Sequence, residues 1–64
     1  MITEKSIIVM VDELNSYSRV MFPKLQLQLN KESILMSYRS NPNYALQRLV
    51  EFKEKLEIAF KQVS

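Results

Sequence analysis

KLQLQLNKESILMSYR, residues 24–39, decides whether the fold is mixed or purely helical. Over residues 24–30 leucine alternates strictly with polar residues, which places three leucines on one face of an extended chain. Such alternation is typical of a half-buried strand. Residues 33–39 can form its antiparallel partner across a turn at residues 30–32. The pattern therefore predicts a β-hairpin.

A helix through residues 24–39 is the competing interpretation of the same stretch. Leucine, glutamine, lysine, glutamate and methionine are good helix formers, and the turn of the hairpin would lack the glycine that tight turns favour. A single helix over the whole stretch would, however, scatter its leucines around the cylinder. We therefore expect the hairpin, with an all-α arrangement of three helices as the main alternative.

The residues after this stretch predict an amphipathic helix from Pro42 onward. Asn41 can cap it, and proline suits the first helical position because its missing N–H would have no partner there. Apolar residues then recur in alternating steps of four and three, a heptad pattern flanked by Leu46, Val50 and Phe60. We call this pattern the seam; its members are Ala45, Leu49, Phe52, Leu56, Ala59 and Val63. The seam can pack on the protein's own core or pair with a second chain.

The residues before the stretch predict a helix over residues 4–19. Thr3 is a suitable N-cap, and Glu4 lies where the helix dipole favours an anion. Apolar residues recur at helical spacings of three and four, namely Ile7, Met10, Val11, Leu14, Tyr17 and Met21. The β-branched residues within Ile7–Val11 would also suit a short strand. The complete expectation is one small α+β domain over residues 1–64, in the order helix, β-hairpin, helix, with the last helix covering the sheet.

The composition excludes most catalytic and cofactor chemistry. The 64 residues contain no cysteine, histidine or glycine, so a disulfide, a thiolate or imidazole metal site and a glycine-rich phosphate loop are excluded. The adjacent carboxylates of Asp12 and Glu13 would point about 100° apart on a helix and would not converge on a substrate. We expect a protein that is not an enzyme and that uses no metal or cofactor.

The small size of the chain favours association with a partner. A chain of this length buries only about 60% of the surface that its unfolded form exposes, and natural proteins of this size lean on disulfides, metals or a second subunit. We therefore expect a homodimer. The longest apolar run, Ile7–Val11, is far shorter than the roughly 18 residues of a membrane span, and no signal-peptide pattern is present. These features predict a cytoplasmic protein.

These expectations together predict a small binding or regulatory protein that acts through protein–protein contacts. Aromatic and apolar side chains surrounded by charged ones are the usual anchors of an interface. The candidate partner-binding residues are Tyr44, Phe52, Leu56, Phe60, Lys53 and Lys61.

Two nucleic-acid alternatives remain open. If residues 24–30 form a strand, one polar face presents Lys24, Gln26, Gln28 and Asn30, and a dimer pairing this strand with its copy would resemble a ribbon–helix–helix repressor that reads DNA in the major groove. The second alternative is an RNA or phosphate surface, although Glu51 would repel phosphates there. That surface would use Arg39, Arg48, Lys55, Tyr38 and Tyr44.

Overall fold

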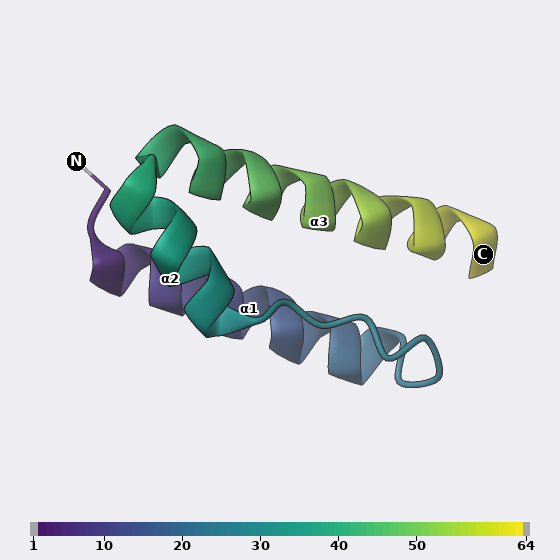
Figure 1. The fold of residues 1–64 in the computed structure, drawn as a ribbon. Coiled ribbons are helices and arrows are strands. Elements are labelled where there is room, and N and C mark those ends of the chain that lie inside the picture. The colour runs from purple at the N-terminus through teal and green to yellow at the C-terminus, as the bar shows by residue number, and fades with distance from the viewer. Residues whose placement is uncertain (1, 64) are drawn as a thin grey trace.

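The computed structural model describes residues 2–63, and the side chains of residues 2–62, as three helices joined by short connections (Figure 1). The helices are α1 (Glu4–Met21), α2 (Lys31–Ser40) and α3 (Pro42–Val63). Helices α1 and α3 run in the same direction, and α2 runs back between their N-terminal parts (Figure 1). The result is an elongated molecule of 36 × 18 × 16 Å.

Helix α1 begins where the sequence predicts. The side chain of Thr3 accepts a hydrogen bond of 3.2 Å from the backbone N–H of Ser6, which satisfies one of the free donors of the first turn. Ile7 and Val11, one turn apart, are fully buried, as the helical interpretation requires. The helix extends two residues beyond the predicted end, and the backbone N–H of Phe22 closes it on the carbonyl of Ser18 at 2.8 Å.

Residues 22–30, which we call the return segment, lead the chain back along α1 to the start of α2 (Figure 1). The segment turns at residues 23–25, and Gln26 follows with a positive φ of 55°. Leu27 and Leu29 are then partly buried, while Gln28 between them is exposed. The alternation of leucine and polar residues is therefore real over these positions, and it describes an extended segment.

The predicted α+β fold is wrong, because residues 2–63 contain no strand and residues 31–40 form α2 instead of the second strand of a hairpin. The Asn30 side chain caps α2 by accepting a 3.1 Å hydrogen bond from the N–H of Ser33. Glu32 lies in the first turn and Arg39 in the last, the charge order that the helix dipole favours. The three-helix alternative is the correct fold class, and its middle helix begins only at Lys31, after the alternating residues 24–30.

Helix α3 follows α2 after the single residue Asn41, whose side chain accepts a 3.1 Å hydrogen bond from the N–H of Asn43. The prediction of a helix from Pro42 is confirmed. The side chain of Val63 lies outside the described residues, and the other five members of the seam are buried: Ala45, Leu49, Phe52, Leu56 and Ala59.

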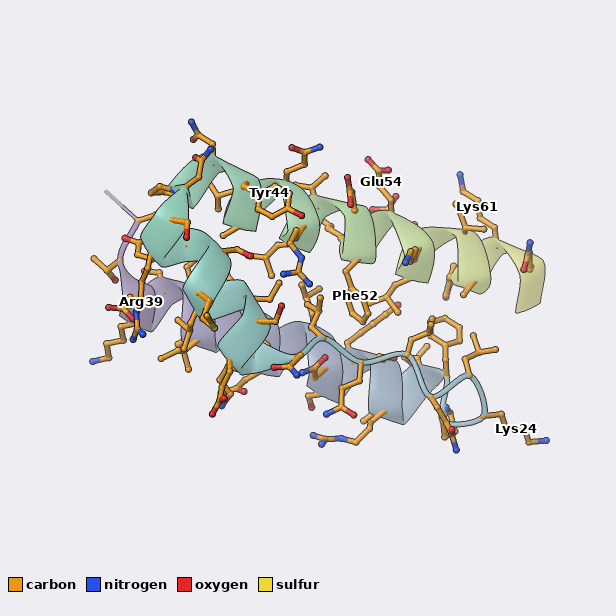
Figure 2. All side chains as sticks on the ribbon, viewed as in Figure 1. Lys24, Arg39, Tyr44, Phe52, Glu54 and Lys61 are labelled. Atoms are coloured by element: carbon orange, nitrogen blue, oxygen red, sulfur yellow. The ribbon has the colours of Figure 1, made fainter. Side chains whose placement is uncertain are left out.

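The buried apolar side chains form two clusters along the length of the molecule. The first lies where α2 contacts α1 and α3, and its buried members are Ile7, Val11, Ile34, Ala45 and Leu49. The second joins the C-terminal half of α3 to the return segment, and its buried members are Phe22, Phe52, Leu56 and Ala59. Figure 2 shows Phe52 pointing from α3 toward the return segment. Both clusters draw on the seam, so the seam is part of the protein's own core.

Candidate partner-binding groove between helices α1 and α3

Helices α1 and α3 form the two walls of an open groove with a volume of about 840 Å³. Apolar side chains dominate its lining, three from α1 and five from α3: Met10, Leu14, Tyr17, Leu46, Leu49, Val50, Leu56 and Phe60. Several of them are largely accessible to solvent, with exposed fractions of 43% for Tyr17, 54% for Val50 and 50% for Phe60. The groove is therefore an apolar surface that the monomer leaves uncovered.

The α3 wall of the groove is a second heptad pattern, displaced by one residue from the seam. Its members recur in steps of four, three, four and three, and we call them the groove stripe: Leu46, Val50, Lys53, Glu57 and Phe60. Each residue of an α-helix is rotated by about 100° from the one before it, so a displacement by one residue gives a neighbouring face. Helix α3 thus has two adjacent faces at heptad spacing, one in the core and one along the groove.

Charges of both signs lie among these apolar residues. The basic residues are Lys53 and Lys61 on α3, and the acidic residues are Glu57 on the same helix and Glu13 on α1. The side chains of all four residues are exposed. Asp12, the neighbour of Glu13, instead forms an ion pair of 3.1 Å with Lys31 of α2, so the adjacent carboxylates diverge as the sequence predicts.

The groove contains four of the six predicted partner-binding residues. Leu56, Phe60, Lys53 and Lys61 line it, although Leu56 is only 3% exposed and belongs mainly to the core. Phe52 is 6% exposed and is a core residue that does not line the groove.

Tyr44, the sixth predicted residue, belongs to a different surface. It is 52% exposed and lines a shallow hollow beside α2, together with Met36 and Ser40. The structure therefore does not bring Tyr44 together with Phe60.

The groove also includes residues outside the six that the sequence predicts for partner binding. Leu46 and Val50 were recognised only as flanks of the seam, and Met10 and Tyr17 only as part of the periodicity of α1. The second set of four-and-three steps was the signal that could have identified the α3 wall. The contribution of α1 depends on which helices are neighbours, which the sequence pattern does not specify.

The residues of the DNA alternative do not form one flat face. Lys24 projects from the turn at the far end of the molecule (Figure 2). Gln26 has a positive φ, and the Asn30 side chain is engaged as the N-cap of α2. Gln28 is exposed on the extended part. DNA binding stays an untested prediction, without the hairpin on which it was built.

Most residues of the phosphate-binding alternative form contacts within the fold. The guanidinium of Arg39, labelled in Figure 2, forms an ion pair of 2.9 Å with Glu4 at the start of α1. The hydroxyl of Tyr38 donates to the carbonyl of Ile2 at 2.8 Å. Nη1 of Arg48 donates to the hydroxyl oxygens of Ser33 and Ser37, at 2.8 and 3.1 Å. These contacts connect the helices, and Lys55 remains as an exposed lysine on α3.

Residues 2–63 contain no group of three or more acidic, cysteine or histidine side chains that could hold a metal ion. None of the helices within this range combines the length and the apolar character that crossing a bilayer requires. No family model, curated protein or solved structure matches the chain.

Proposed function

We propose that this protein is a small non-catalytic binding protein that acts by accepting an amphipathic helix of a protein partner in the groove between α1 and α3. The observation that carries the proposal is the groove stripe, which continues for about four helical turns. Two of its three apolar members, Val50 and Phe60, are 54% and 50% exposed, and the third, Leu46, is partly buried.

The shape of the groove favours a helix as the occupant. Its walls are two helices that run side by side, and a third helix laid along them can place side chains at the same heptad spacing. The apolar residues would then supply the apolar contacts of the interface, and the charged residues its polar contacts.

The charges of the groove favour a protein over a nucleic acid. Glu13 and Glu57 lie on the same groove as Lys53 and Lys61, and their carboxylates would repel phosphates. An amphipathic helix has charged residues of both signs beside its apolar face and can match all four.

A photo-crosslinking experiment tests this proposal. Val50 is replaced by p-benzoylphenylalanine in cells that make the protein, and Ile58 is replaced in a parallel sample. Both positions are on α3 and are similarly exposed, at 54% and 56%, but only position 50 lines the groove. We expect a discrete protein adduct from position 50, lost when Phe60→Glu is added, and none from position 58.

The opposite patterns contradict the proposal. Equal adducts from both positions would indicate non-specific collisions, and the absence of any adduct from position 50 would show that no protein occupies the groove. Mass spectrometry of the adduct identifies the partner and the residues that contact the groove.

A further inference from the structure

We infer that the occupant of the groove is a second copy of this chain, with the two α3 helices antiparallel and Lys53 of each copy opposite Glu57 of the other. This inference rests on the proposed docking function and adds to it the identity of the partner and the register of the contact. Its basis is the order of residues in the groove stripe.

Between Val50 and Phe60, the spacing of the groove stripe is the same in both directions along the helix. The intervals from Val50 to Lys53, from Lys53 to Glu57 and from Glu57 to Phe60 are three, four and three residues. A two-fold axis perpendicular to α3, placed midway between Lys53 and Glu57, therefore brings Val50 of each copy opposite Phe60 of the other. The same axis brings each Lys53 opposite a Glu57, and a self-complementary contact of this kind is what a two-fold dimer requires.

The charges select the antiparallel arrangement. In a parallel pair in register, Lys53 would meet Lys53 and Glu57 would meet Glu57, and both contacts would be repulsive. In the antiparallel pair, both central contacts join opposite charges, and they are flanked on each side by an apolar contact of Val50 with Phe60. In helical assemblies, a polar pair within an otherwise apolar heptad contact specifies register and orientation.

The rest of the groove and the small core support the same occupant. Met10, Leu14 and Tyr17 on the α1 wall supply further apolar surface, so two copies would form an arrangement of four helices. Only nine apolar side chains among those described are buried in the monomer. Without cysteine for a disulfide, a second subunit is the available way to enlarge such a core.

Charge reversal tests the register through sedimentation equilibrium of the full chain. K53E makes both central contacts acidic in its own dimer, and E57K makes both of them basic. We expect each variant alone to self-associate at least about tenfold more weakly than the unmodified chain. Mixed in equal amounts, K53E and E57K restore two opposite-charge contacts, so we expect a heterodimer with close to the original affinity.

The outer face of α3 provides matched controls. Glu51 and Lys55 have the same spacing as Lys53 and Glu57 but do not line the groove. K55E and E51K therefore make the same changes of net charge and, like K53E and E57K, place two like charges four residues apart on α3. We expect both controls to associate like the unmodified chain.

Three results would overturn the inference: an unmodified chain that is monomeric at the highest concentration reached, equal weakening by the controls, or failure of the mixture to recover association. These results are separate from a failure of the docking function. A monomer whose crosslinker at position 50 still captures a different protein overturns the self-pairing alone, whereas no adduct at position 50 overturns both.

Discussion

The side-chain amide of Asn15 on α1 forms hydrogen bonds with both backbone polar groups of Leu29. Its Oδ1 accepts from the N–H at 2.7 Å, and its Nδ2 donates to the carbonyl at 3.1 Å. A neighbouring antiparallel strand would give Leu29 the same two bonds. Helix α1 therefore takes the place of a strand, and the Leu29 side chain packs against both core clusters.

Replacement of Asn15 by alanine should destabilise the fold more than the same replacement of Asn43, the other asparagine within a helix. The substitution leaves the N–H and the carbonyl of Leu29 without partners in a partly buried place, which costs about 2 kcal/mol in the free energy of unfolding. Urea denaturation followed by circular dichroism measures this loss. Asn43→Ala is the control, because Asn43 is exposed in the first turn of α3. Equal losses for the two variants would show that the Asn15 contact does not hold the return segment.

Ser18 provides the second connection between α1 and the return segment. It is 1% exposed, and its hydroxyl donates a 2.7 Å hydrogen bond to the carbonyl of Leu27. We expect Ser18→Ala to lower the free energy of unfolding by about 1 kcal/mol, because the carbonyl loses its partner. Ser16→Ala is an exposed control on the same helix with the same change in helix propensity. A Ser18→Ala variant as stable as Ser16→Ala would contradict this role.

These two contacts explain why the sequence pattern led to a hairpin. Alternating leucines predict extended backbone, and Leu27 and Leu29 do alternate toward the core. The pattern does not specify which groups satisfy the extended backbone, and here they are the side chains of Asn15 and Ser18. The backbone hydrogen bonds that a partner strand would make are made here by Asn15 and Ser18 of α1.

The sequence contains the start and stop signals of α2, although the alternation of residues 24–30 favours a strand just before them. Asn30 as the N-cap, Glu32 in the first turn and Arg39 in the last turn are the usual start and stop signals of a helix. A helix would scatter leucines around its cylinder only if it included Leu25, Leu27 and Leu29, whereas α2 begins after all three. The α1 and α3 predictions succeeded because caps and apolar periodicity agreed there. Of the candidate site, the sequence indicated Lys53, Leu56, Phe60 and Lys61 but not the α1 wall.

The conformation of Gln26 predicts a stabilising substitution in a chain without glycine. Its φ of 55° lies in the left-handed region, which costs a residue with a Cβ atom about 1 kcal/mol relative to glycine. We expect Gln26→Gly to raise the free energy of unfolding by up to about 1 kcal/mol. Thermal denaturation measures the change.

Gln28→Gly is the control for this substitution, because Gln28 is an exposed glutamine in the same segment without a positive φ. Glycine there only adds freedom to the unfolded chain, so Gln28→Gly should lower the stability. A loss of similar size at both positions would contradict the argument from the Gln26 conformation.

Phe52 and Phe60 on α3 should separate folding from association. Phe52 is 6% exposed within the second core cluster, so Phe52→Ala leaves a cavity and should cost about 3–5 kcal/mol, enough to lose most of the helical circular dichroism. Phe60 is 50% exposed on the groove, so Phe60→Ala should change the free energy of unfolding by less than about 1 kcal/mol. The same variant removes both contacts of Val50 with Phe60 in the proposed dimer, and we expect self-association to weaken at least about tenfold in sedimentation equilibrium. A Phe60→Ala variant that unfolds like Phe52→Ala would place Phe60 in the core, and one that folds and associates normally would show that the groove is not the interface.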